Sequence, residues 1–193
     1  DILHGDGGND TAEGGEGNDA IYGDDGDDRL VGGAGADSLY GGTGNDTVDY
    51  RSSGAGVTID LANNSGAGGD ATGDVFAIGS IENVDGSEFA DTLTGNAGAN
   101  ILKGFGGSDL LVGGAGDDSF DGGDGIDTVV YAGNAGSYTI DFNAKTITHS
   151  GSDGVDSFTN IEFIQFADSV INVANKAPTA PGAFTNQSTF DNA

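Results

Sequence analysis

A nine-residue repeat restricts the folds open to this chain more than any other feature of the sequence. Residues 5–49 divide without a gap into GDGGNDTAE, GGEGNDAIY, GDDGDDRLV, GGAGADSLY and GGTGNDTVD, and residues 1–4 are the tail of one more unit. A second array over residues 86–130 reads GSEFADTLT, GNAGANILK, GFGGSDLLV, GGAGDDSFD and GGDGIDTVV. Both arrays follow the pattern G-G-x-G-x-D-x-U-x, where U is a large apolar residue, so the chain is a repeat protein.

Each position of the repeat has a physical role. The glycines permit positive φ and close backbone approach in a tight turn, and the aspartate places a charged oxygen at its end. The last three residues form a short strand whose U side chain points inward, and because two nonapeptides make one coil, residues 18 apart stack at roughly 4.8 Å. The predicted inward column is Leu3, Ala12, Ile21, Leu30, Leu39, Val48, Leu93, Leu102, Leu111, Phe120 and Val129.

The two arrays belong to a longer duplication. At an offset of 81 residues Asp46-Thr47-Val48 recurs as Asp127-Thr128-Val129, and at an offset of 80 Ile81-Glu82 recurs as Ile161-Glu162. The segments between and after the arrays alternate apolar and polar residues, which favours strands. We therefore predict an all-β chain with a first array over 1–49, an irregular β segment that continues the solenoid over 50–85, a second array over 86–130, a β cap over 131–173 and a linker to a following domain over 174–193.

Charge and glycine content show that apolar burial alone is a weak source of stability here. The chain has 32 Asp and Glu against 5 Lys and Arg, a formal net charge of -27, and 38 Gly. Carboxylates in such excess repel one another, and glycine raises the conformational entropy that folding must overcome. Carboxylates and backbone carbonyls are the ligands that calcium prefers, so we expect a hard cation to supply the missing stability.

The same composition excludes several partners. Nucleic acid and anionic lipid headgroups both require clustered Lys and Arg, which this acidic chain lacks. Its sequence has no apolar run long enough to span a bilayer, so we expect no membrane insertion. Without Cys there is no disulfide or thiolate chemistry. Because the sequence begins inside a repeat, we expect flanking domains of a longer chain.

The nonapeptides resemble the repeats-in-toxin (RTX) family of secreted bacterial proteins, also called hemolysin-type calcium-binding repeats. The resemblance implies a right-handed parallel β-roll in which calcium ions lie between turns one coil apart. In that pattern the earlier turn gives the carbonyls of its second and fourth residues and its aspartate. The turn 18 residues later gives its first and third carbonyls and its aspartate, so we expect roughly seven or more ions.

Carried onto this chain, the resemblance pairs Asp1 with Asp19, Asp10 with Asp28, Asp19 with Asp37, Asp28 with Asp46, Asp91 with Asp109, Asn100 with Asp118 and Asp109 with Asp127. The carbonyls expected from the earlier turns are those of Asp6, Gly8, Gly15, Gly17, Asp24, Gly26, Asn96, Gly98, Phe105 and Gly107. The carbonyls expected from the later turns are those of Gly23, Asp25, Gly32, Ala34, Gly41, Thr43, Gly113, Ala115, Gly122 and Asp124. Asn100 is a neutral amide, and Ser87 and Phe89 replace turn glycines, so we expect weaker sites there.

Catalysis finds no comparable support in the sequence. His4 and His149 are the only imidazoles, and no serine lies in a G-x-S-x-G elbow. Carboxylate pairs suited to glycoside hydrolysis are too abundant in so acidic a chain to be informative. We therefore expect no enzyme activity in this chain. Tyr22, Tyr40, Tyr50 and Tyr131 lie at or just after strand ends, where they either pack along the coil edge or form an exposed contact stripe.

Function follows from the resemblance, which implies a calcium-dependent structural and spacer module of a secreted or cell-surface bacterial protein. It also implies type I secretion of an unfolded chain that folds on extracellular calcium. The tail NKAPTA resembles linkers of adhesins, which makes an adhesin the leading parent, with an unidentified surface ligand or receptor as its partner. The alternatives are an appendage of an extracellular protease, lipase or alginate epimerase, or a surface-layer protein.

Overall fold

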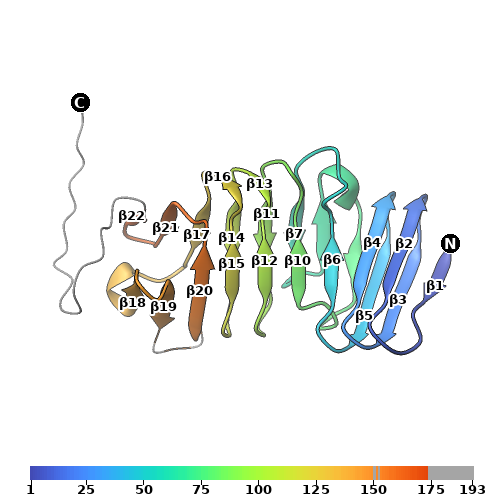
Figure 1. Ribbon diagram of the computed structural model, residues 1–193, viewed down its shortest axis with the longest axis horizontal. Coiled ribbons are helices and arrows are strands. Elements are labelled where there is room, and N and C mark those ends of the chain that lie inside the picture. The colour runs from blue at the N-terminus through green and yellow to red at the C-terminus, as the bar shows by residue number, and fades with distance from the viewer. Residues whose placement is uncertain (150, 152, 174–193) are drawn as a thin grey trace.

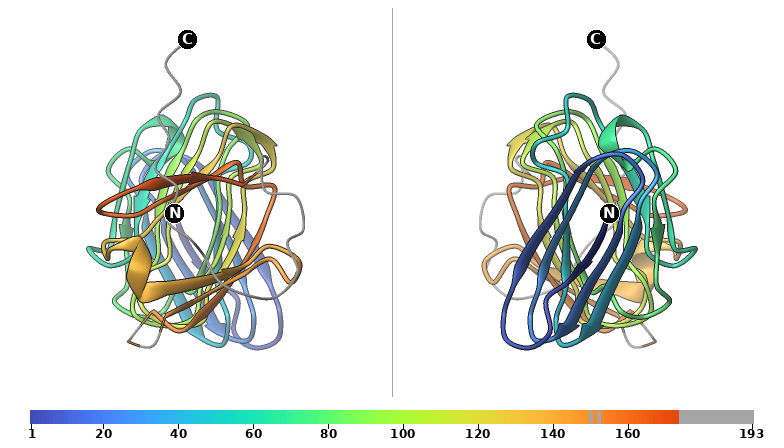
Figure 2. Two further views of the ribbon diagram at one scale, coloured as in Figure 1. Left: turned by 90° about the vertical axis from the view of Figure 1, so that its left-hand side faces the viewer. Right: turned by 90° about the vertical axis from the view of Figure 1, so that its right-hand side faces the viewer.

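The computed structural model describes residues 1–149, 151 and 153–173, so the predicted linker over 174–193 lies outside the described residues. Short strands stand side by side along the longest axis of the molecule, starting from the N-terminus at one end (Figure 1). Viewed along that axis, the chain winds as a flattened coil with strands on two opposite sides (Figure 2). Two short 3-10 turns, η1 (Gly69–Ala71) and η2 (Ala135–Ser137), interrupt the strands.

Two large sheets form the sides of the coil. The first sheet has 11 strands in the spatial order β1 (Ile2–His4), β3 (Ala20–Asp25), β5 (Ser38–Thr43), β9 (Val75–Phe76), β8 (Ser65–Ala67), β7 (Thr58–Asp60), β11 (Thr92–Thr94), β14 (Leu110–Val112), β17 (Thr128–Val130), β21 (Phe163–Gln165) and β22 (Val170–Asn172). The second sheet has 9 strands in the order β18 (Tyr138–Asp141), β19 (Thr146–His149), β20 (Val155–Thr159), β15 (Ser119–Asp121), β12 (Ile101–Lys103), β10 (Asn83–Asp85), β6 (Thr47–Asp49), β4 (Arg29–Ala34) and β2 (Thr11–Glu16). A small sheet of 2 strands pairs β13 (Gly106–Gly107) with β16 (Asp124–Gly125).

Register within the arrays follows the two-repeat coil. Ile21 pairs with Leu39, and Leu93 pairs with Leu111, each in a parallel ladder between residues one coil apart. Successive nonapeptides alternate between the two sheets, because each coil contributes one strand to either side. The all-β parallel β-roll predicted from the repeat is therefore confirmed.

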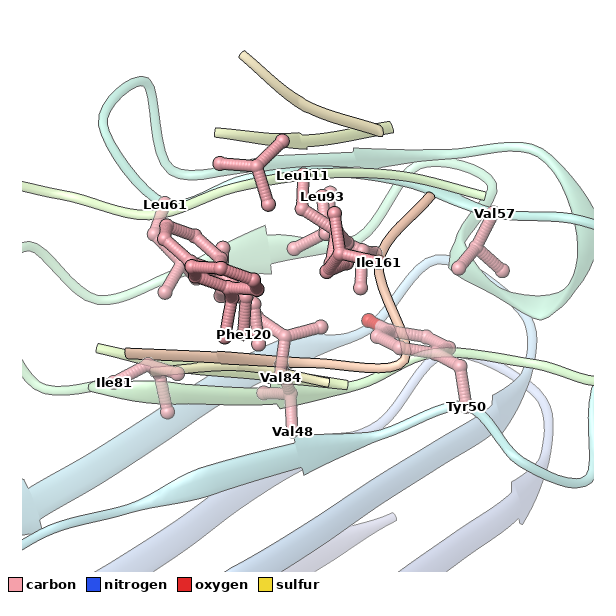
Figure 3. Close-up of a cluster of buried hydrophobic side chains, with 14 of the residues drawn as sticks. Val48, Tyr50, Val57, Leu61, Ile81, Val84, Leu93, Leu111, Phe120 and Ile161 are labelled. Atoms are coloured by element: carbon pink, nitrogen blue, oxygen red, sulfur yellow. The ribbon is translucent and has the colours of Figure 1, made fainter. Parts of the chain in front are cut away.

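The core lies between the sheets and combines the U side chains with other buried apolar residues, such as Val48 and Phe120 with Tyr50 (Figure 3). Residues outside the arrays extend the column in register, since Val84 pairs with Val48 and Phe158 pairs with Phe120. Leu3 and Ala12, at the N-terminal end, are only partly buried because one side of their coil has no neighbour. The fully buried array members are Ile21, Leu30, Leu39, Val48, Leu93, Leu102, Leu111, Phe120 and Val129.

The segment between the arrays keeps both sheets continuous. In the first sheet, β9 pairs parallel with β5, β8 runs antiparallel to both β9 and β7, and β7 pairs parallel with β11. In the second sheet, β10 pairs parallel with both β6 and β12. Antiparallel pairs recur near the C-terminal end, where β18 pairs with β19, β19 with β20 and β21 with β22. The boundaries of the five predicted segments stay predictions.

Several of the few cations gather at one place on the second sheet. Arg29 from β4 forms an ion pair with Asp49, and its Nη1 lies 3.0 Å from Asp85 Oδ2. Arg51 Nε lies 3.2 Å from Asp49 Oδ1, and Lys103 Nζ lies 3.6 Å from Asp85 Oδ1. Burial acts to raise the pKa of Asp49, but hydrogen bonds from Arg51 and Arg29 outweigh it and lower that pKa. These two carboxylates are thus paired with cations of the protein itself.

The tyrosines divide between two environments. Tyr22 stacks on Tyr40 with ring centroids 4.5 Å apart, along the outer side of β3 and β5. Tyr50 and Tyr131 are buried instead, and their hydroxyls reach carboxylates inside the roll.

Candidate metal centres

From Asp19 onward the array aspartates lie buried at the ends of the turns, where one carboxylate oxygen ties each coil to the preceding one. The backbone N–H of Asp19 donates to Asp37 Oδ1 at 2.8 Å, and the N–H of Asp28 donates to Asp46 Oδ1 at 2.8 Å. The N–H of Asp109 donates to Asp127 Oδ1 at 2.9 Å in the second array. Asp10 with Asp28, Asp91 with Asp109 and Asn100 with Asp118 repeat the contact. Each carboxylate is thereby held in a fixed orientation.

The second oxygen of most of these carboxylates has no partner. Folded proteins satisfy the great majority of buried polar atoms, and an unpaired buried carboxylate is costly. In this chain the unpaired oxygens are all Oδ2 atoms, and each belongs to the aspartate at the sixth position of its repeat. Among the described residues, the buried side-chain oxygens without a hydrogen-bond partner are the Oδ2 atoms of Asp10, Asp19, Asp28, Asp37, Asp46, Asp109 and Asp127. A cation at each of these oxygens would remove the penalty.

The first carbonyl of the next coil converges on the same space as the unpaired oxygen. A Cβ built on Gly14 would lie 2.5 Å from Asp19 Oδ2 and 2.6 Å from the Gly32 carbonyl oxygen. A Cβ on Gly23 would likewise strike Asp28 Oδ2 and the Gly41 carbonyl oxygen. At Gly14 and Gly23 the first glycine of the repeat therefore keeps open a space that two oxygens from different coils approach.

The remaining turn residues also stack one coil apart. The carbonyl oxygens of Gly15 and Gly17 lie close to the next coil. A Cβ built on Gly33 would clash with the first oxygen, and one built on Gly35 would clash with the second. The same relation joins Gly8 to Gly26, Asp24 to Gly42, Asn96 to Gly114, Gly98 to Gly116, Phe105 to Gly123 and Gly107 to Gly125. Second- and fourth-position carbonyls thus face the later turn, where the resemblance places the ion.

Third-position carbonyls already accept one hydrogen bond in the first array. Gly17 N–H donates to the Ala34 carbonyl at 2.8 Å, and Gly8 N–H donates to the Asp25 carbonyl at 2.7 Å. Gly26 N–H makes the equivalent bond to the Thr43 carbonyl at 2.9 Å. Since a carbonyl oxygen has two lone pairs, one remains for a cation. In the second array, Asp124 N–H donates to the second-position carbonyl of Phe105, and Ala115 N–H donates to that of Asn96.

Electrostatics at the turns favours loss of negative charge. Burial, opposed by a backbone hydrogen bond and reinforced by neighbouring carboxylates, raises the pKa of Asp46 from 3.8 to about 6. Burial raises the pKa of Asp109 and of Asp118 to about 7, again with nearby carboxylates contributing. Burial also raises the pKa of Asp37 and Asp127. A divalent cation would reverse these shifts, because it stabilises the ionised form.

Two predicted positions are satisfied by the protein itself. Asp91 Oδ2 accepts a hydrogen bond from Ser87 N–H at 2.6 Å, and Asp91 Oδ1 accepts one from Val57 N–H at 2.7 Å. Asn100 donates its Nδ2 to the Glu82 carbonyl at 2.7 Å, and its Oδ1 accepts the N–H of Asn96 at 2.8 Å. Asp1 is exposed, and its terminal amino group contacts Asp19 Oδ1. The weaker sites predicted at Asn100 and in the turn of Ser87 thus gain a structural reason, while the ligand assignments stay predictions.

The sequence reasoning assigned no role to four carboxylates that continue the ladder beyond the arrays. Asp74 Oδ1 accepts the N–H of Asp37 at 2.8 Å, and Glu82 Oε2 accepts the N–H of Asp46 at 2.9 Å. Asp156 and Glu162 do the same for Asp118 and Asp127, at 2.8 and 2.9 Å. The duplication of Ile81-Glu82 as Ile161-Glu162 is the sequence signal that could have identified the glutamates.

Side chains alone do not make these centres. Within residues 1–149, 151 and 153–173, no group of three or more His, Cys, Asp or Glu side chains is arranged to hold a metal ion. Each candidate centre combines carboxylates from two coils with backbone carbonyls. No helix in the same part of the chain is long and apolar enough to cross a membrane.

Comparison with known proteins agrees with the repeat. No curated protein matches the chain. One similar solved structure is the crystal structure of the extracellular lipase LipA from Serratia marcescens, with 18% sequence identity and a TM-score of 0.29 over 78% of this chain and 36% of the lipase chain. The sequence profile of the RTX calcium-binding nonapeptide repeat matches four times, over residues 1–30, 22–52, 85–120 and 106–129. With both arrays matched, the chain belongs to the RTX calcium-binding nonapeptide repeat family.

Proposed function

We propose that this chain is a calcium-dependent structural module of a secreted bacterial protein and has no catalytic role of its own. The observation that carries the proposal is the set of unpaired, buried Oδ2 atoms at the turn ends, which face carbonyls of the adjacent coil. Calcium satisfies these oxygens and offsets the net charge of -27. The ion is structural, because stacked turns surround it with protein oxygens and leave little room for a substrate.

Calcium fits these centres better than magnesium does. Calcium takes roughly 6 to 8 oxygen ligands in flexible geometry, whereas magnesium requires near-ideal octahedral geometry and retains several of its waters. Carboxylates from two coils and up to four carbonyls supply that many oxygens without water. We propose roughly seven or more ions, in the aspartate pairs given above.

The parent protein we propose is an adhesin, in which the roll is a spacer that stiffens on reaching extracellular calcium. Support comes from the linker-like tail, which lies outside the described residues. The second candidate is an appendage of an extracellular enzyme. Tandem β-sandwich domains after residue 193 would favour the adhesin, whereas a catalytic domain before residue 1 would favour the enzyme.

Export and folding are linked in this proposal. A type I system would pass the unfolded chain out of a calcium-poor cytosol, and extracellular sites of this kind bind at roughly 10⁻⁴ to 10⁻³ M calcium. Binding outside the cell would then fold the roll and disfavour its return.

Calorimetric titration of the calcium-free chain tests the proposal. We expect uptake of several calcium ions at about millimolar concentration, coupled to a large folding enthalpy, and no comparable transition with magnesium. A chain that takes up no calcium at these concentrations would contradict the proposal.

A further inference from the structure

The first array ends against a segment that is not a nonapeptide but occupies the place of one. Asp46 is 0% exposed, and its Oδ2 has no hydrogen-bond partner. The carbonyl oxygen of Ser80 reaches the space over Gly41, where it takes the position that the Gly32 carbonyl has over Gly14. Glu82 Oε2 accepts the N–H of Asp46 at 2.9 Å, as the next aspartate does elsewhere in the array.

The second array ends in the same way. Asp127 is 0% exposed with an unpaired Oδ2, and a Cβ on Gly122 would lie 2.5 Å from that oxygen. The carbonyl oxygen of Asn160 reaches the same space over Gly122, and Glu162 Oε2 accepts the N–H of Asp127 at 2.9 Å. The same arrangement at both array ends shows that it belongs to the duplicated unit.

At the array ends a glutamate takes the place of the aspartate, because the segment between the carbonyl and the carboxylate is shorter than in a nonapeptide. In a nonapeptide, five positions separate the first carbonyl from the aspartate, as between Gly32 and Asp37, but only two separate Ser80 from Glu82. The backbone at Glu82 is anchored directly, since Glu82 N–H and Asn83 N–H both donate to the Asp46 carbonyl, at 3.1 and 2.9 Å. The additional methylene of glutamate lets the carboxylate reach the Asp46 amide from this shorter segment.

Each array has a second terminal carboxylate on the other edge of the coil, and there a tyrosine hydroxyl binds the carboxylate. Asp74 binds the N–H of Asp37 through Oδ1, but its Oδ2 accepts a hydrogen bond from the Tyr50 hydroxyl at 2.7 Å. Tyr131 makes the same bond to Asp156 Oδ2 at 2.6 Å. On that side a phenolic proton satisfies the second oxygen of the terminal carboxylate. The last array aspartate there, Asp37, keeps an unpaired Oδ2, as Asp46 and Asp127 do at the glutamate ends.

We propose that Glu82 and Glu162 each close a further calcium site, which lies outside the nonapeptide pattern. The first site comprises the carboxylates of Asp46 and Glu82 with the Ser80 carbonyl, and the second comprises those of Asp127 and Glu162 with the Asn160 carbonyl. Carbonyls of the last turn complete each site according to the repeat pattern. This inference rests on the proposed binding of calcium between turns, and adds one ion at the end of each array.

Counting bound calcium by native mass spectrometry tests the inference on Glu82→Gln, Glu162→Gln and the double variant. The glutamine oxygen can still accept the N–H of Asp46 or Asp127, so the backbone anchor is kept while one ligand charge is lost. At calcium concentrations that just saturate the wild-type chain, each single variant should bind one ion fewer and the double variant two fewer. Glu13→Gln, an exposed glutamate on β2, is the charge-matched control and should bind the wild-type number.

Crystals of the calcium-bound wild-type chain give a second measurement that does not depend on variants. Anomalous scattering should place one ion against Glu82 and another against Glu162. If the wild type binds calcium but the double variant keeps the full number, or neither glutamate contacts an ion, the closing sites are wrong and the array sites stand. If the wild type binds no calcium, both the inference and the proposed function are overturned.

Discussion

Asp28→Asn is expected to raise the calcium concentration at the midpoint of folding by about tenfold or more, because ligand charge tunes the affinity of such sites. Asp28 is 2% exposed, and its unpaired Oδ2 faces the Gly41 carbonyl across one coil. The resemblance places it in two sites, so its neutralisation affects both. The asparagine Oδ1 can still accept the N–H of Asp10, which keeps the coils anchored.

Asp27→Asn is the matched control in the same turn. Asp27 is exposed, and its Oδ1 accepts the N–H of Asn45 at 2.9 Å, a bond that asparagine can keep. We expect its midpoint to stay within about twofold of wild type, as for other surface substitutions. Calcium titrations followed by tyrosine fluorescence report the midpoint, because Tyr50 and Tyr131 become buried on folding. Equal shifts in the two variants would refute the assignment of Asp28 as a ligand.

Acidification is expected to stabilise the calcium-free roll. The pKa of Asp46 and Asp74 in the fold is about 6, and that of Asp109 and Asp118 is about 7, all raised from 3.8 chiefly by burial. A carboxyl whose pKa is higher in the folded state binds more protons there, so folding is favoured at low pH. This contribution is complete below about pH 4 and is lost as the pH rises through 6 to 7.

Far-ultraviolet circular dichroism of the calcium-stripped chain between pH 8 and pH 5 measures the effect, because the calcium-free chain is expected to be a coil near pH 7.5. The β-structure content should rise as the pH falls to 5, and Asp109→Asn, already neutral, should reduce that rise, whereas Asp27→Asn should leave it unchanged. Saturating calcium should reverse the trend, because the ion binds only ionised carboxylates. A calcium-free chain with equal β-structure at both pH values, or with more at pH 8, would show that the buried carboxylates are not the source of its instability.

The repeat predicted the roll and its core because both depend only on local periodicity. Once two nonapeptides form a coil, Ile21 must stack on Leu39, and the same rule extends through both arrays. The aspartate pairs follow from the same period, and the N–H groups of Asp19 and Asp28 do contact the aspartates one coil later. That each pair shares a calcium ion stays a prediction.

The repeat did not predict the structure at the array ends, because that structure depends on contacts between residues far apart in sequence. Tyr50 reaches Asp74 across 24 residues, and Arg29 reaches Asp85 across 56. No period relates these residues, so their pairing follows only from how the irregular segment folds back on the roll. Glu82 was visible as half of a duplicated dipeptide, but its role required the position of Ser80 over Gly41.

Far-ultraviolet circular dichroism during a calcium titration of the calcium-free chain at pH 7.5, with magnesium as the control, tests the central claim most directly. We expect a cooperative change from coil to β-structure near about 10⁻³ M calcium and no change at the same magnesium concentration. A β spectrum already present without calcium would contradict the claim, since the core of the roll would then be stable without the ion.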